Sequence, residues 1–170
     1  HRPAAAVVYY RRALNVAPTN AVIHLNLGTV FLKSGRPQAA VAAYRRALRA
    51  DPELVGAKLQ LAWVLATAKD DTLRNGGEAV RLAEEVRSES GEDHARPLDV
   101  LAAAYAEVGR FDDACRVASQ GLTVAASDGP AEQLESLRAR LLLYRHGKPY
   151  REESSADPEP TASEIPDDLS

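Results

Sequence analysis

The sequence predicts an all-α fold in which pairs of antiparallel helices stack side by side. The segment Tyr10–Leu14 recurs unchanged as Tyr44–Leu48, 34 residues later, and Pro18 and Pro52 follow the two copies at the same offset. A repeat of this length fits two helices, which cover their apolar faces by stacking on the next unit. Alanine supplies 31 of the 170 residues and aromatic residues only 5%. This composition favours closely packed helices over a β-sandwich.

The first expected helix spans residues 4–17 and matches only the second half of a repeat. Because the sequence contains no methionine and opens at His1, we expect it to begin in mid-repeat, as the terminal part of a longer array. An incomplete pair leaves an apolar flank, through Val7, Tyr10 and Leu14, that offers a surface for self-association.

Residues 21–54 are expected to form the first complete pair of helices. Gly35 stands just past the first helix, where a left-handed C-cap is easiest for glycine. Pro37 then starts the returning helix. The run Asp51-Pro52-Glu53 has the order of an N-cap, a first-turn proline and a first-turn acid, and so predicts the start of the next helix.

The second pair, residues 55–94, is irregular. From Leu61 to Leu101 there are 40 residues rather than 34, and the polar, glycine-containing stretch 69–77 predicts a loop that holds the excess. Residues 95–128 return to the regular pattern, with Gly109 after the first helix. Residues 131–146 then form a capping helix, because Arg138 occupies the place where a continuing repeat needs a small residue. Its apolar side comprises Leu134, Leu137, Leu141, Leu142 and Tyr144. The prediction is eight helices: one unpaired, three pairs and one cap.

The last residues differ in composition from the rest. Residues 151–170 hold seven acids against Arg151, a local net charge of −6, so the formal net charge of −3 leaves the preceding 150 residues at about +3. This segment contains three prolines and too few large apolar residues to offset its ordering entropy. We predict a disordered acidic tail over 149–170, after an array that spans 1–148.

The repeated positions resemble the tetratricopeptide repeat. Residues 21–54 match that pattern at Leu27, Gly28, Phe31, Gly35, Ala40, Tyr44, Ala47 and Pro52, with His24 in place of the usual tryptophan. Residues 95–128 match at Leu98, Leu101, Ala102, Tyr105, Gly109, Ala114 and Ala118, although Gly121 replaces an alanine. The resemblance implies a right-handed α-α superhelix with a half repeat at 4–20 and repeats at 21–54, 55–94 and 95–128. The long second repeat and the ending around Leu141–Arg151 are similar to the C-terminal part of certain bacterial arrays.

The resemblance also implies that the first helix of each pair lines a concave groove suited to an extended peptide or a partner helix. The implied groove residues are Val22, Leu25, Asn26, Thr29, Lys33, Leu59, Gln60, Trp63, Arg96, Asp99, Ala103 and Glu107. Trp63 is the best single anchor, because tryptophan is favoured at interface hot spots. The alternative is that Trp63 packs beneath the 69–77 loop. Some family members bind a terminal carboxylate with a clamp of lysine, asparagine and arginine, and this clamp is absent here. Lys33 and Arg96 are therefore either groove contacts of another kind or solvated surface.

No constellation predicts an enzyme, a cofactor or a metal site. The four histidines are dispersed, and His24 is expected to fill a place between helices. Cys115 is the only cysteine and is expected to be a small buried residue. The basic residues on second helices have no aromatic stacking platform, so we expect no nucleic-acid partner. The longest apolar run, 4–10, is too short to span a bilayer.

Two functions fit these observations. In the first, the chain is a scaffold that binds a protein or peptide in its groove. In the second, it is the non-catalytic C-terminal segment of a larger bacterial enzyme, such as a glycosyltransferase-like or membrane-anchored protein, as the resemblance allows. The sequence predicts no compartment and names no partner.

Overall fold

The computed structural model describes residues 3–90, 94–128 and 130–152, and this part of the chain folds into eight α-helices without a strand. The elements are α1 (Pro3–Val16), α2 (Ala21–Lys33), α3 (Pro37–Ala50), α4 (Val55–Thr67), the short 3₁₀-helix η1 (Asp71–Leu73), α5 (Gly76–Ser90), α6 (Ala95–Glu107), α7 (Phe111–Asp128) and α8 (Ala131–Arg145). The predicted all-α solenoid and its helix order are confirmed.

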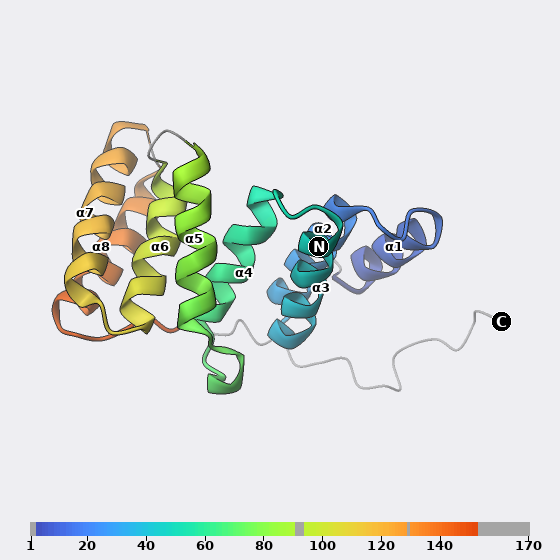
Figure 1. Ribbon diagram of the computed structural model, residues 1–170, viewed down its shortest axis with the longest axis horizontal. Helices are drawn as coiled ribbons and strands as arrows, with labels where there is room; N and C mark the ends of the chain where they lie inside the picture. The colour runs from blue at the N-terminus through green and yellow to red at the C-terminus, as the bar shows by residue number, and fades with distance from the viewer. Residues whose placement is uncertain (1–2, 91–93, 129, 153–170) are drawn as a thin grey trace.

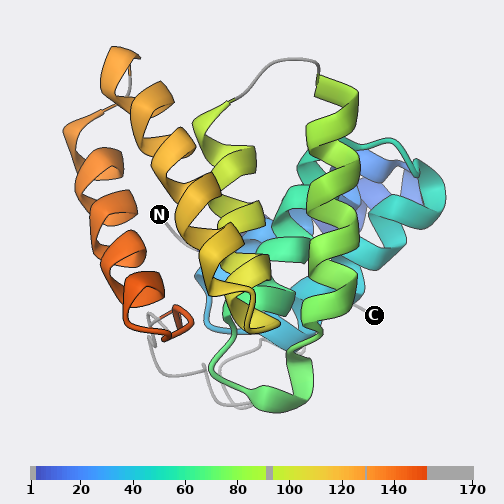
Figure 2. The same cartoon turned by 60° about the vertical axis from the view of Figure 1, so that its left-hand side comes forward.

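The helices follow one another along the long axis of the molecule, from α1 at one end to α7 and α8 at the other (Figure 1). Within each pair the two helices pack together, α2 on α3, α4 on α5 and α6 on α7, and α4 also packs on α6. Turned by 60°, the molecule presents α5, α6, α7 and α8 as neighbouring rods (Figure 2). Of the first helices, α4 and α6 pack directly on each other, whereas the first pair joins the second mainly through α3 against α4.

Small residues lie where the helices cross. Ala40, Ala62, Ala102 and Ala114 are fully buried. At Gly28 the approach is closer still, since a Cβ atom built there would lie 2.5 Å from the ring of Tyr44. Glycine is therefore required at this crossing by the width of the tyrosine ring.

Three helices end in the same backbone motif. Gly35, Gly109 and Gly147 each have a positive φ, of 69°, 78° and 65°. In each case the next amide donates to a carbonyl five residues back, as Arg36 does to Phe31 at 2.9 Å, and the glycine amide donates to a carbonyl three residues back. This is the Schellman arrangement, which satisfies the last carbonyls of a helix. The left-handed turns expected at Gly35 and Gly109 are confirmed, and Gly147 adds a third.

Two local predictions need correction. Asp51-Pro52-Glu53 does not start α4, which begins at Val55 after an N-cap at Leu54. Instead Asp51 ends α3, and its carboxylate accepts a hydrogen bond from the amide of Glu53 at 3.1 Å. The same side-chain chemistry that caps a helix also stabilises a turn. In α8, Leu142 is 57% exposed and does not share the buried side of Leu137, Leu141 and Tyr144.

The prediction of an exposed apolar flank on the first helix is also wrong in the residues that it names. Val7, Tyr10 and Leu14 are partly buried against the core, whereas Val8, Tyr9 and Val16 carry the exposed apolar surface of α1. The expected flank is the face that packs on α2. His24 is buried, as expected for a residue between helices, and its Nε2 lies 2.9 Å from the carbonyl of Pro18. Cys115 is half-buried rather than buried.

The described chain continues past the array. Residues 149–152, which the sequence assigns to the acidic tail, are packed against α4, α6 and α8. The remainder of the predicted tail, 153–170, lies outside the described residues.

Candidate peptide-binding groove

Helix α4 ends differently from the other first helices. Lys69 occupies the place that glycine holds after α2 and α6, and Ala68 has an ordinary φ of −55°. The last carbonyls of a helix lack partners within the helix and need them from elsewhere. Here the partners come from distant segments. The carbonyl of Leu65 accepts from the amide of Asn75 at 3.0 Å, and that of Thr67 accepts from the amide of Glu152 at 2.9 Å.

Two arginines complete this substitute cap. Arg74, which follows η1, donates through Nη1 to the carbonyls of Ala68 and Lys69 at 3.1 and 3.0 Å. Arg151 donates to the carbonyl of Ala66 at 3.3 Å. Cations are favoured at a helix C-terminus, where the backbone dipole is negative. Because no glycine turn follows α4, its last carbonyl groups have no local partners, and later residues of the chain donate hydrogen bonds to them instead.

Residues 148–152, called the C-terminal strap from here on, run without helical structure from the end of α8 to α4. Gly147-Lys148-Pro149 repeats the pattern of Gly35-Arg36-Pro37, in which the proline begins a returning helix. After Pro149 no helix forms in the described residues. The strap instead lays Tyr150 and Glu152 against the first helices.

Trp63 is the centre of the surface that the strap covers. The side chain is only 5% exposed, and its Nε1 donates a hydrogen bond of 2.7 Å to Oε2 of Glu152. The Tyr150 ring lies on it with a centroid separation of 5.8 Å. The guanidinium carbons of Arg96 and Arg140 lie 4.5 and 5.4 Å from the centroid of the indole, in cation–π geometry. The residues that contact Trp63 thus come from α6, α8 and the strap.

Asp99 holds these two arginines in place. Arg140 grips its carboxylate with two hydrogen bonds, from Nε at 2.8 Å and from Nη2 at 3.0 Å. Arg96 adds a longer contact of 3.4 Å. Burial raises the pKa of the Asp99 carboxyl, and the two guanidiniums act against that rise. The buried carboxylate of Asp99 is thus paired and hydrogen-bonded, which is the condition for burying a charge.

Glu107 links the strap to the loop between α4 and α5. One carboxylate oxygen accepts from Nε of Arg74 at 3.0 Å, and the other forms an ion pair with Arg151 at 2.7 Å. The two arginines that cap α4 are therefore both anchored on the end of α6. This explains why loop and strap lie together at one edge of the molecule.

The predicted groove residues fall into two sets. The enclosed set lies under or beside the strap and comprises Trp63, Arg96, Asp99, Ala103 and Glu107, with Asp99 and Ala103 fully buried. The open set lies on α2 and the start of α4 and comprises Val22, Leu25, Asn26, Thr29, Lys33, Leu59 and Gln60, all half-buried or exposed. Val22 is 52% exposed. The structure brings the enclosed set into one cluster and leaves the open set only partly covered, with Leu25 and Leu59 packed against the core.

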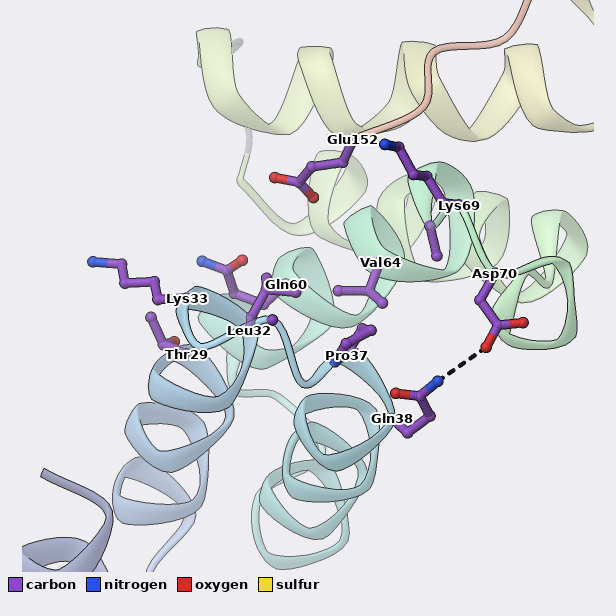
Figure 3. A pocket seen from close by; sticks show the side chains of 12 residues that line it. Thr29, Leu32, Lys33, Pro37, Gln38, Gln60, Val64, Lys69, Asp70 and Glu152 are labelled. Atoms are coloured by element: carbon purple, nitrogen blue, oxygen red, sulfur yellow. Dashed lines mark hydrogen bonds between the residues drawn. The ribbon is translucent and has the colours of Figure 1, made fainter. Parts of the chain in front are cut away.

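A pocket of about 470 Å³ lies beside the open set, of which Thr29, Lys33 and Gln60 belong to its lining (Figure 3). Its apolar lining includes Leu32, Pro37 and Val64, and its polar lining comprises Thr29, Lys33, Gln38, Gln60, Lys69, Asp70 and Glu152. On one side Gln38 donates a hydrogen bond of 2.9 Å to Asp70, which closes the pocket between α3 and the loop. The last described residue, Glu152, forms part of its wall.

Sequence reasoning missed five residues of this arrangement: Arg74, Arg140, Tyr150, Arg151 and Glu152. Two signals pointed to them. One was Lys69 in place of the glycine that should end α4, and the other was the Gly-Lys-Pro sequence after α8, which mirrors the start of α3. Neither signal identifies which side chain meets which, because the contacts join residues up to 89 positions apart.

Comparison with known families agrees with the geometry. The model of the tetratricopeptide repeat matches residues 1–55 and again 25–73. Residues 1–73 therefore belong to the tetratricopeptide repeat family. No curated protein matches the chain. Tetratricopeptide repeats generally mediate protein–protein interaction, and the family is typically a non-catalytic scaffold.

Two other features of the structure concern membrane-spanning helices and metal clusters. In the described residues, no helix has the length and apolar character that crossing a membrane requires. The same residues contain no group of three histidine, cysteine, aspartate or glutamate side chains placed to hold a metal ion.

Proposed function

We propose that the open set of groove residues, together with the adjoining pocket, binds an extended segment of a partner protein. The observation that carries this proposal is the strap. A non-helical segment already lies on the same face, held by a backbone hydrogen bond from Glu152 to Thr67 and by the side-chain contact with Trp63. A surface that accepts one such segment has the shape and the polar groups to accept another beside it.

The pocket has the mixed lining expected of a peptide site. Leu32 and Val64 give an apolar floor, while Thr29 and Gln60 offer a hydroxyl and an amide above it. An apolar floor buries a side chain and convergent polar groups fix its orientation. Because Glu152 belongs both to the strap and to the pocket wall, a bound peptide would continue along the groove from the point that the strap reaches.

The two sets of groove residues then have different roles in the proposal. Val22, Leu25, Asn26 and Leu59 would extend the contact from the pocket toward α1. Trp63, Arg96, Asp99, Ala103 and Glu107 would hold the strap and shape one end of the site. The proposal assigns no catalytic step to any residue, and the partner is another protein rather than a nucleic acid.

A phage-displayed library of random peptides, selected on the full chain, tests this function. We expect a shared sequence motif among the selected peptides. Binding of a selected peptide should be lost in Thr29→Arg and in Leu25→Arg, which place a long cation in the groove. The matched control is Leu142→Arg, the same substitution at an exposed leucine of α8, and it should keep the affinity of the wild type.

Circular dichroism on each variant separates loss of binding from loss of folding. Thr29→Arg should disturb the fold less than Leu25→Arg, because Leu25 also packs near Gly56. The proposal is wrong if no motif emerges, or if folded Thr29→Arg and Leu142→Arg bind a selected peptide equally well.

A further inference from the structure

Charge divides the molecule more sharply than its net value indicates. Residues 3–67, from α1 to α4, contain eight lysines and arginines and only two acids, Asp51 and Glu53. The difference is a formal charge of +6. Residues 153–170 contain six acids (Glu153, Asp157, Glu159, Glu164, Asp167 and Asp168) and no basic residue, a formal charge of −6. Opposite charges of equal size therefore belong to the N-terminal half of the array and to the last segment of the chain.

The described chain ends beside the basic region. Glu152 lines the pocket between α2 and α4, so residue 153 follows directly from the pocket wall. The strap is fixed at that point by the amide of Glu152 on Thr67 and by its carboxylate on Trp63. An extended chain covers about 3.3–3.6 Å per residue. The first few residues of the acidic segment are thus long enough to cross the pocket.

Two lysines in this pocket have no ionic partner among the described residues. Lys33 at the end of α2 and Lys69 after α4 are both exposed and line the pocket. No described residue makes an ion pair or a hydrogen bond with either ammonium group. Near the other end of the array, Arg116 and Arg138 are paired with acids on their own helices, and Arg110, just before α7, is paired with Asp113. Unpaired cations beside the point where an acidic segment begins are electrostatically complementary to it.

We infer that the acidic segment 153–168 of this chain occupies the pocket between α2 and α4, with its carboxylates beside Lys33 and Lys69. The inference rests on the proposed function, because it places the segment where a partner peptide would bind. The segment needs no fold of its own to do so, since exposed charges attract each other without fixed geometry. A partner would then have to displace it, and acidic peptides would be the preferred ligands of the open groove.

Paramagnetic relaxation measured on the full chain tests this occupancy without any added peptide. A nitroxide is attached at Ser163→Cys in a Cys115→Ala background, and amide signals are compared before and after reduction of the label. We expect a loss of intensity at Thr29, Lys33 and Gln60 and none along α7. The loss should vanish in 1 M NaCl, where the screening length falls to about 3 Å.

The double variant Lys33→Glu, Lys69→Glu should abolish the loss. The matched control, Arg138→Glu with Arg145→Glu, makes the same change in net charge on exposed residues of α8 and should leave the loss in place. Equal effects of the two double variants would overturn the inference, because attraction would then follow total charge rather than the pocket.

A mixture of isotope-labelled chain without nitroxide and unlabelled chain with nitroxide identifies the molecule that supplies the segment. Intensity loss in that mixture would assign the segment to a second copy and overturn the inference. Absence of any loss in the labelled chain alone would do the same. Peptide selection on the chain can still succeed in either case, so failure here and failure of the proposed function are distinguishable.

Discussion

At the scale of single residues, two glycines inside helices differ in the space that their neighbours leave for a Cβ atom. A Cβ atom at Gly28 would lie 2.5 and 2.6 Å from two ring carbons of Tyr44, which is fully buried and has no space to retreat. A Cβ atom at Gly121 would meet the Cβ of Leu98 at 3.4 Å, an ordinary contact. Both positions are occupied by glycine, but only the first requires it.

We therefore expect Gly28→Ala to lower the free energy of unfolding by about 1–3 kcal/mol through overpacking. Gly121→Ala should raise it by about 0.5–1 kcal/mol, because glycine is unfavourable within a helix. Urea unfolding measures both, with each variant serving as the control of the other. A loss of stability in Gly121→Ala as large as that in Gly28→Ala would contradict the assigned packing.

Tyr144 gives a residue-scale prediction for alkaline pH. Its hydroxyl is buried and has no hydrogen-bond partner in the described residues, and burial raises the pKa of its phenol. Above a pH of about 10 the unfolded chain ionises this tyrosine while the folded chain keeps the proton. The free energy of unfolding then falls by up to about 1.4 kcal/mol per pH unit from this group.

In Tyr144→Phe that share of the fall is absent, so the decline in stability above pH 10 should be shallower than in the wild type. At neutral pH the variant should be as stable or more so, because a buried hydroxyl without a partner is removed. The matched control is Tyr9→Phe, at a ring that is 70% exposed. Parallel alkaline declines for wild type and Tyr144→Phe would contradict this account.

At the scale of elements, the strap acts as a cap for α4 and a cover for Trp63. Trp63 is the only tryptophan in the chain, so its fluorescence reports on this contact alone. Acrylamide should quench it poorly in the wild type, because Tyr150, Arg96 and Arg140 surround the indole. Tyr150→Ala with Glu152→Ala should raise the quenching constant and shift the emission to longer wavelength.

The control for this double variant is Arg145→Ala with His146→Ala, two exposed residues at the end of α8. It should leave quenching unchanged. Strong quenching in the wild type would show that the strap does not protect the indole, and no change in the strap variant would assign the protection to α6 and α8 alone.

At the scale of the whole molecule, the repeat was predictable from the sequence and the strap was not. The helices, the turns at Gly35 and Gly109 and the small residues at crossings follow from a 34-residue period and from local backbone chemistry, both of which can be read from neighbouring positions. The groove could be predicted only as a set of positions that the first helices share. That set includes Arg96 on α6 but leaves out the other partners of Trp63, which lie 77 or more residues away in α8 and the strap.

The errors have the same origin. Asp51 was assigned to the wrong element because a carboxylate beside a free amide serves a turn as well as a helix start. Val7, Tyr10 and Leu14 were expected to be exposed because the sequence does not specify which side of α1 meets α2. In a stacked array each unit contacts its neighbours, so such choices depend on the adjoining unit rather than on the helix itself.

The Gly147 turn has one more consequence. Because the strap is joined covalently to α8 by a fixed backbone motif, it meets α4 as a tethered ligand, at an effective concentration of order millimolar for a short linker. Even if each contact of the strap is weak, the strap can therefore stay bound to the end of α4 almost all the time. A free peptide competing for the same carbonyls must overcome that local concentration, whereas cleavage of a single bond after Gly147 would remove it at once.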